Sequence, residues 1–249
     1  MRIIISPAKK MKTDTDSFAV TNIPVFIRKA ENLLDILKSM SFEELKKLWK
    51  CNENIAKLNF ERLHTMKLTK NLTPALVSYE GIQYQYMAPG VFSTEQLQYV
   101  EKHLRIISGF YGLLKPFDGV TPYRLEMQAK LKTESFKNMY DFWKDEIYKK
   151  IISETDTIIN LASKEYSKCI TDFLPSSNGI KFITCSFSEM KNGKPIEKGT
   201  LCKMARGEMV RFLAENNIEN PEDIKGFDRL NYSFSPDYSD EKTYMFIKA

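Results

Sequence analysis

The sequence is poor in the residues on which most metal sites and hydrolase sites depend. It contains four cysteines, none of them in a CxxC pair, and only two histidines, His64 and His103. We therefore do not expect a zinc or iron–sulfur site, a His-rich metal site or a Ser–His–Asp triad. We predict no metal site and no cofactor, and we interpret the cysteines as reduced, mostly buried thiols.

Long apolar runs are absent as well. No run in the sequence approaches the roughly 20 apolar residues that a helix needs to cross a bilayer. The first residues, MRIIISPAKK, turn polar too early for a signal peptide. We therefore expect a cytoplasmic protein without a membrane partner. The sequence also lacks a P-loop, a GxGxxG motif and an HExxH motif, so no motif specifies a reaction, and nothing in it indicates the oligomeric state.

The composition is that of a globular protein. Of the 249 residues, 43% are hydrophobic and 28% are charged, so the chain can bury a substantial core. It shows no internal repeat, low-complexity tract or linker, which favours one domain over residues 1–249. The net charge of +5 permits contact with a polyanion without requiring it.

Short apolar, β-branched runs and segments of helical periodicity follow one another along the chain, which favours an α/β (mixed α+β) fold. An Asn192–Gly193 pair predicts a turn after the fourth of these runs. The predicted strands are Arg2–Ile5, Leu104–Ser108, Asp156–Leu161, Ile180–Phe187, Tyr232–Phe234 and Thr243–Ile247. The predicted later helices cover about Ser93–His103, Asn138–Ile152 and Thr200–Asn216, and a short helix starts at Asn220–Pro221.

Two stretches remain ambiguous. Thr73 before Pro74 is typical of a helix start, yet Ala75–Tyr79 could equally be a strand. The tyrosines of residues 79–87 could stack on bases or form a half-buried aromatic cluster.

Residues of about 24–66 are predicted to form a helical hairpin and a third helix. Ser41 and Glu44 form a capping box at the start of the second helix, with Met40 and Leu45 at the positions of a hydrophobic staple. Periodicity predicts helices over about Pro24–Lys38, from Ser41, and over about Asn52–Met66.

The hairpin has two interpretations. Two helices joined by so short a turn can bind a DNA backbone through turn amides and helix N-termini. Ser41 and Lys46 are then candidate phosphate contacts. A hairpin that serves only packing explains the same pattern, and the turn lacks the glycine that DNA-binding hairpins usually have.

The stretch Ser108–Met127, SGFYGLLKPFDGVTPYRLEM, is the most distinctive part of the chain. It holds three glycines and two prolines within twenty residues, which exclude a long helix. Its aromatic and leucine side chains need burial, which argues against disorder. We predict a compact, packed loop that leaves the strand at Ser108 and holds Arg124 and Glu126 in a fixed place.

Polar side chains follow two of the predicted strands. Lys9 and Lys10 follow the first, and Asn160, Ser163 and Glu165 lie at the end of the third. Ligands of open α/β sheets bind beyond the carboxyl ends of strands, and helix N-termini favour anions, so both strand ends are candidate phosphate sites. Solvated lysines, and helix capping by Ser163, explain the same residues equally well.

The predicted helix Thr200–Asn216 carries Lys203, Arg206 and Gly207 on one face, with Arg211 to the side. A glycine within a helix costs about 1 kcal/mol relative to alanine. Its presence indicates that something approaches the backbone closely, either a phosphate or another helix.

If these groups converge, they form a cationic site that contains one or two carboxylates. Arginine side chains match phosphate oxygens, which favours a nucleic acid or another phosphorylated ligand. In an enzyme, Glu126 or Glu165 would be the general base and Arg124 an oxyanion stabiliser. A purely structural ion pair between Arg124 and Glu126 is the third interpretation. The catalytic residues therefore stay unknown, with these three as candidates.

Four motifs stand out along the chain: ISPAKK, LRIISGFYGLLKPFDGVTPYRLEM, NLASKEYSK and KMARGEMVRF. In sequence and in order they resemble those of the YaaA family of bacterial peroxide-stress proteins. The resemblance implies a cytosolic protein that limits free iron and oxidative damage. It further implies a single mixed α/β domain of unusual topology, with a mixed sheet flanked by helices, a helix-hairpin-helix element and a positively charged cleft that binds double-stranded or branched DNA. Our leading hypothesis is a DNA-binding protein without catalysis, and the alternative is an enzyme on a phosphorylated or nucleotide substrate.

Overall fold

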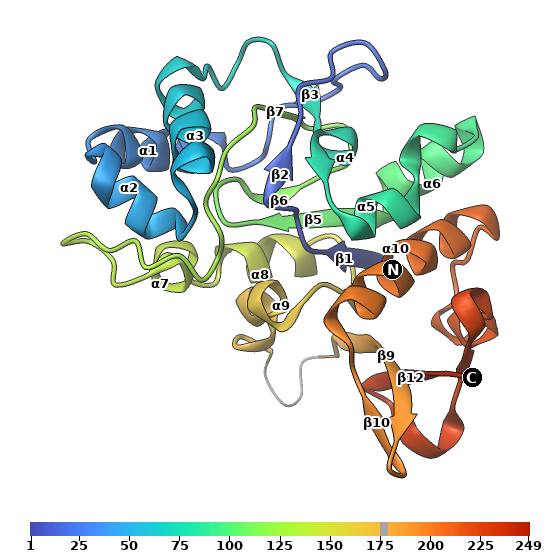
Figure 1. Ribbon diagram of the computed structural model, residues 1–249. Helices are drawn as coiled ribbons and strands as arrows, with labels where there is room; N and C mark the ends of the chain where they lie inside the picture. Colours follow the sequence, from blue (N-terminus) through green and yellow to red (C-terminus); the bar gives the residue numbers. More distant parts are fainter. Residues whose placement is uncertain (175–178) are drawn as a thin grey trace.

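The computed structural model of the protein describes residues 1–174 and 179–249 and centres on an eight-stranded mixed sheet (Figure 1). The strand order is β11-β12-β9-β8-β1-β5-β6, with β10 paired to β9. Strands β12, β9, β8, β1 and β5 run parallel through the middle of the sheet, whereas β6, β10 and β11 are attached antiparallel. The predicted α/β class with a mixed sheet is confirmed.

The strands of the sheet lie close to where the β-branched runs predicted them. The sheet contains β1 (Arg2–Ile5), β5 (Leu104–Ser108), β6 (Gly112–Leu114), β8 (Thr157–Leu161), β9 (Lys181–Lys191), β10 (Lys194–Ile196), β11 (Tyr232–Phe234) and β12 (Thr243–Lys248). Four very short strands form two separate pairs, β2 (Lys10–Met11) with β4 (Tyr79–Glu80) and β3 (Thr73–Pro74) with β7 (Gly119–Val120).

The central strands are buried because helices flank the sheet. Ile3, Ile4 and Ile5 of β1 are fully buried, as expected for an apolar run between two parallel neighbours. In Figure 1, α5 and α6 lie above the central strands and α8 and α9 lie below them. The helices are α1 (Ile27–Lys38), α2 (Phe42–Trp49), α3 (Glu53–Thr65), α4 (Ala75–Ser78), α5 (Ile82–Met87), α6 (Thr94–His103), α7 (Met139–Trp143), α8 (Glu146–Ile152), α9 (Lys164–Thr171) and α10 (Gly199–Glu215). Short 3₁₀ helices are η1 (Pro89–Val91), η2 (Pro221–Gly226), η3 (Arg229–Asn231) and η4 (Pro236–Tyr238).

The hairpin of α1 and α2 and the third helix α3 are present where the periodicity predicted them. Ser41 and Glu44 form the expected capping box at the start of α2. The backbone N–H groups of Ser39, Met40 and Ser41 all donate within the hairpin, to Asp35 O, Leu37 O and the Glu44 carboxylate. The turn amides are thus satisfied internally, and the buried apolar side chains of the three helices, such as Leu33, Leu45 and Leu63, belong to the core. These contacts account for the hairpin as a packing element.

One predicted helix is wrong in its extent. Residues 138–152 form two helices, α7 and α8, because Lys144 between them has a φ of +46° and a ψ of −132°. The break lets Trp143 bury fully and donate its indole N–H to the carbonyl oxygen of Gly109 at 2.9 Å. A long-range contact has overridden the local helical pattern.

The two ambiguous stretches are resolved by tertiary contacts. Thr73 is part of strand β3 and accepts a hydrogen bond from the backbone of Asp14 at 2.8 Å, while Ala75–Ser78 is a single helical turn. Tyr79 and Tyr84 are buried, and the hydroxyl of Tyr79 lies 2.9 Å from that of Tyr123. The tyrosines therefore form an aromatic cluster.

Candidate phosphate-binding cleft

A cleft of about 430 Å³ opens at the carboxyl ends of β1, β5 and β8. It is lined by the loop after β1, the start of α5, the end of the loop that follows β5, the start of α9 and one side of α10. Eight of the predicted site residues line it, namely Lys9, Lys10, Arg124, Glu126, Ser163, Glu165, Lys203 and Arg206. Among the described residues, five basic side chains face three acidic ones there, the remaining acid being Glu80.

The floor of the cleft is the packed loop after β5. A Cβ atom on Gly109 would lie 2.5 Å from the carbonyl oxygen of Leu125, so only glycine lets the end of β5 pass this close to residues 125–127. The hydroxyl of Ser108 accepts hydrogen bonds from the backbone N–H groups of Phe110 and Tyr111, at 3.2 and 2.9 Å. These contacts hold both ends of the loop together and place the Arg-x-Glu pair rigidly at the cleft.

Arg124 and Glu126 form an ion pair that Lys9 joins. Nη2 of Arg124 lies 3.4 Å from Oε1 of Glu126, and Nζ of Lys9 lies 3.3 Å from the same oxygen. Nη2 also donates to the carbonyl oxygen of Trp49 at the end of α2, at 3.4 Å. The side chains of Arg124 and Glu126 are only 10% and 15% exposed, so water screens this pair weakly. The structural ion pair predicted from the sequence is present, and it faces the cleft.

Glu165, next to the N-terminal end of α9, is the second carboxyl group of the cleft. Its Oε1 accepts a hydrogen bond from the backbone of Gln128 at 3.1 Å. Burial raises the pKa of Glu165, and the negative charge of Glu126 raises it further, although the Gln128 N–H and Lys9 oppose the shift. The two carboxyl groups therefore differ in environment, and Glu165 keeps its proton to a higher pH than an ordinary glutamate does.

The basic wall of the cleft is positioned by a close helix crossing. A Cβ atom on Gly207 would lie 2.1 Å from the carbonyl oxygen of Gln83 and 2.9 Å from the backbone nitrogen of Met87, so α10 rests directly on α5. Of the two explanations for this glycine, the structure shows the second, another helix. The crossing directs Lys203 and Arg206 toward the cleft, where neither forms an ion pair with the described residues.

Several buried polar atoms at the cleft have no hydrogen-bond partner among the described residues. They are Nε of Arg124, Nε of Arg206, Nε2 of Gln83 and Oε1 of Glu126, although the last lies between two cations. Such atoms cost free energy unless something pairs with them, and buried polar groups without a partner are uncommon. Their concentration in one cleft indicates a polar, charged ligand.

Four of the predicted site residues lie outside the cleft. Asn160 is buried, accepts from the backbone of Ala162 at 2.9 Å and donates to Thr184 at 3.2 Å, so it braces the end of β8. The other three are Ser41, which caps α2, Lys46, which pairs with Glu53, and Arg211, which pairs with Glu215.

Ser163 lines the cleft, but it does not cap α9 through its side chain. It occupies the N-cap position of α9, yet its side chain makes no capping hydrogen bond. Its backbone N–H donates to the hydroxyl of Ser6 at 2.8 Å, and its own hydroxyl accepts from Ser6 at 3.3 Å. Ser163 therefore ties the end of β8 to the loop after β1, and its amide is already occupied.

Gln83 and Ser6 are two cleft residues whose side chains were not predicted as part of the site. Ser6 belongs to the predicted loop after β1, but its contact with Ser163 joins residues 157 positions apart. Gln83 lies within a tyrosine-rich segment and carries no pattern that would single it out. Only the crossing of α5 and α10 brings it beside Arg206.

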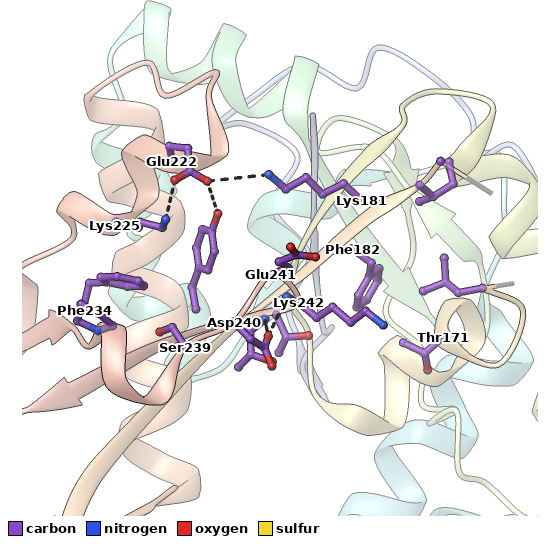
Figure 2. Close-up of a pocket in the computed structure, with 17 residues that line it drawn as sticks. Thr171, Lys181, Phe182, Glu222, Lys225, Phe234, Ser239, Asp240, Glu241 and Lys242 are labelled. Atoms are coloured by element: carbon purple, nitrogen blue, oxygen red, sulfur yellow. Dashed lines mark hydrogen bonds and ion pairs between the residues drawn. The ribbon is translucent and has the colours of Figure 1, made fainter. Parts of the chain in front are cut away.

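A larger cavity of about 1080 Å³ lies away from these residues, between β9, β12 and η2 (Figure 2). Glu222 in its lining has partners already, because it accepts from Lys225 at 2.6 Å and from the hydroxyl of Tyr244 at 2.7 Å. None of the predicted site residues lines it, and none of its described residues carries a buried polar side-chain atom without a partner. Size alone therefore does not make it the better candidate.

The described part of the chain holds neither a metal-ligand cluster nor a membrane-spanning helix. In residues 1–174 and 179–249 no three His, Cys, Asp or Glu side chains gather as a metal site requires. No described helix is long and apolar enough to span a membrane.

Comparison with known proteins identifies the family. A family model described as peroxide stress protein YaaA matches residues 1–238. A UPF0246 protein of Agathobacter rectalis is 57% identical over 246 residues, which cover 99% of this chain and 98% of the relative. A UPF0246 protein of Desulfitobacterium hafniense is 55% identical over 249 residues, which cover 100% of this chain and 98% of the relative. As the four sequence motifs predicted, the chain belongs to the YaaA family of peroxide stress proteins.

Proposed function

We propose that this protein acts in the response to peroxide stress by binding double-stranded or branched DNA through the cleft. The observation that carries the proposal is the pair of arginines, Arg124 and Arg206, whose buried Nε atoms have no partner among the described residues. Guanidinium groups match phosphate oxygens in geometry and charge. Lys203 adds an exposed cation beside them. Contacts of this kind give affinity with little preference for base sequence.

The hairpin would extend the same surface. Arg124 donates to the carbonyl oxygen of Trp49, so the end of α2 lies at the cleft. Lys50, which follows directly, is exposed and in a position to meet a second phosphate. Ser41 and Lys46 remain candidate contacts at other points of the hairpin. Through DNA binding of this kind the protein would limit oxidative damage, and we propose that its link to free iron is indirect.

The salt dependence of binding tests this proposal. Neutralising phosphates releases counterions, so the logarithm of the binding constant should fall linearly with the logarithm of the salt concentration. We expect a steep slope for duplexes of unrelated sequence, measured by fluorescence anisotropy between 50 and 200 mM salt, a range over which about 10³-fold losses are typical of proteins that contact many phosphates. A flat dependence, or binding to one sequence only, contradicts the proposal.

A second candidate function is an enzyme that acts on a phosphorylated or nucleotide substrate. The specific observation in its favour is Glu165, whose pKa is raised by burial and by the charge of Glu126, in the same cleft as two arginines whose Nε atoms have no partner among the described residues. Perturbed carboxyl groups in a cleft are typical of general acid–base sites. In this case Glu126→Gln abolishes function while DNA affinity stays equal or rises. Full activity of that variant during peroxide challenge would exclude catalysis through Glu126.

A further inference from the structure

The position of Glu126 distinguishes this cleft from a plain phosphodiester site. A phosphodiester is singly negative at neutral pH and its oxygens only accept hydrogen bonds. A carboxylate that faces it therefore adds repulsion and no contact. Yet Glu126 lies inside the cleft, 15% exposed, and both of its ion pairs, to Lys9 and Arg124, engage Oε1. Neither ion pair engages Oε2.

The cleft thus combines two kinds of unsatisfied group. Arg124, Arg206 and Gln83 contribute buried nitrogen donors without partners among the described residues, and these call for an anion. Glu126 contributes an acceptor, which calls for a hydrogen-bond donor. A ligand that satisfies both groups has to be anionic and has to carry a proton on the same small group.

We propose that the cleft prefers a terminal phosphomonoester, the phosphate at the end of a nucleic acid strand or on a nucleotide, over an internal phosphodiester. The proposal rests on the function proposed above, in that the cleft is taken as the phosphate-binding surface. A phosphomonoester has a second pKa near 6, so it can keep one proton and donate it to Glu126. Its other oxygens accept hydrogen bonds from Arg124 and Arg206. An internal phosphodiester has no such proton.

The neighbouring groups support this arrangement. Glu165 lines the same cleft, and burial raises its pKa, which shifts this second carboxyl group toward its neutral form and so reduces its repulsion of an anion. Apolar residues of the lining, among them Ile82, Tyr84 and Leu125, leave room for the remainder of a nucleotide beside the phosphate. The volume of about 430 Å³ is within the range of small-molecule sites.

Competition between phosphate and sulfate tests directly whether a proton on the ligand contributes to binding. The two ions have the same shape, but sulfate carries no proton at neutral pH. At pH 6.5 we expect inorganic phosphate to displace a fluorescent 5′-phosphorylated duplex at about tenfold lower concentration than sulfate does, the size of one hydrogen bond to a charged group. In Glu126→Gln the amide can donate to either ion, so this difference should disappear. In the control Glu61→Gln, on the exposed side of α3, the difference should persist.

Duplexes that differ only at their ends test whether the cleft prefers a terminal phosphate. A free mononucleotide then shows whether that phosphate comes from a strand end or from a nucleotide. A duplex with 5′-phosphates should bind about tenfold more tightly than the same duplex with 5′-hydroxyls. Titration with a 5′-mononucleotide shows whether the strand end or the free nucleotide is the better ligand. Equal affinity for both duplexes together with equal competition by phosphate and sulfate would overturn the proposal, and this result needs only the unmodified protein.

Covalently closed circular DNA separates this proposal from the proposed function, because it has no ends. If the circle binds with a steep salt dependence while end preference and phosphate selectivity are absent, DNA binding stands and the terminal phosphomonoester is excluded. If phosphate selectivity is present while neither circle nor duplex binds, the phosphomonoester site stands and DNA binding is excluded.

Discussion

Nη2 of Arg124 lies 3.4 Å from Oε1 of Glu126, two residues further along the chain, at the floor of the basic cleft. Both side chains are nearly buried, and the guanidinium also reaches the carbonyl oxygen of Trp49 in the helical hairpin. The pair therefore joins the loop after β5, the hairpin and the cleft. Glu126 thus partly neutralises Arg124 within the cleft, so the charge there is mixed and not purely basic.

Removing the basic residues of α10 should weaken DNA binding without unfolding the protein. Lys203→Ala and Arg206→Ala are each expected to lower affinity by similar factors on all duplex sequences. Each lost phosphate contact should reduce the slope of log K against log salt by about 0.9. Arg211→Ala is the matched control on the same helix, because Arg211 pairs with Glu215 at 2.7 Å and does not line the cleft. An equal loss in this control would show that overall charge, and not the cleft, drives binding.

Replacing the glycine at the helix crossing should destabilise the fold. In Gly207→Ala the new Cβ atom would meet the carbonyl oxygen of Gln83 at 2.1 Å, so α5 and α10 have to move apart. We expect the free energy of unfolding to fall by about 1–3 kcal/mol, measured by chemical denaturation. Gly199→Ala, at the start of α10, meets no atom within 4 Å and should leave stability unchanged or slightly higher. Similar values for both variants would contradict the close crossing.

The stability of the protein should depend on pH through Asp118. Burial raises the pKa of this carboxyl group from 3.8 to about 6, only partly opposed by the hydrogen bond from the backbone N–H of Lys115. Its pKa is higher in the folded than in the unfolded chain, so folded protein binds more protons between pH 4 and 6. The stability contributed by Asp118 is therefore present at low pH and is lost as the pH rises through about 6.

Asp118→Asn should remove this dependence. The variant is expected to gain up to about 3 kcal/mol relative to the original protein at pH 7.5, and to lose this advantage near pH 4. Denaturant unfolding at several pH values measures the effect. Asp16→Asn, at an exposed position, serves as the control. If the free energy of unfolding has the same pH dependence in the original protein and in Asp118→Asn, burial does not raise the pKa of Asp118.

Ferrous iron should not bind directly and stoichiometrically. In the described parts of the chain no cluster of three potential ligands exists, and three of the four cysteines are buried singly. Burial raises the pKa of Cys169 and of Cys185 to about 12, which disfavours the thiolate that metals require. Anaerobic equilibrium dialysis should leave equal iron concentrations on both sides. One equivalent of retained iron would make the link to iron a direct one.

Much of the framework could be predicted from local patterns. The β-branched runs of β1, β5 and β8 and the capping box at Ser41 involve residues close together in sequence, and each was found as expected. The prediction of one helix over residues 138–152 was wrong because a non-local contact decides the structure there. Trp143 is buried against the loop after β5 and donates a hydrogen bond to Gly109, 34 residues away.

The sequence by itself determined the strands, the hairpin, the packed loop and membership of the family, since these depend on periodicity, turn residues and motifs within short segments. Only the tertiary structure decided which charged residues meet. In the folded protein Lys9 lies beside Glu126, and Gly207 packs where α10 crosses α5. Asn160 forms hydrogen bonds that stabilise the end of β8. The first two contacts join residues more than a hundred positions apart, and the bond from Asn160 to Thr184 crosses to the neighbouring strand, so all depend on how the whole sheet is assembled.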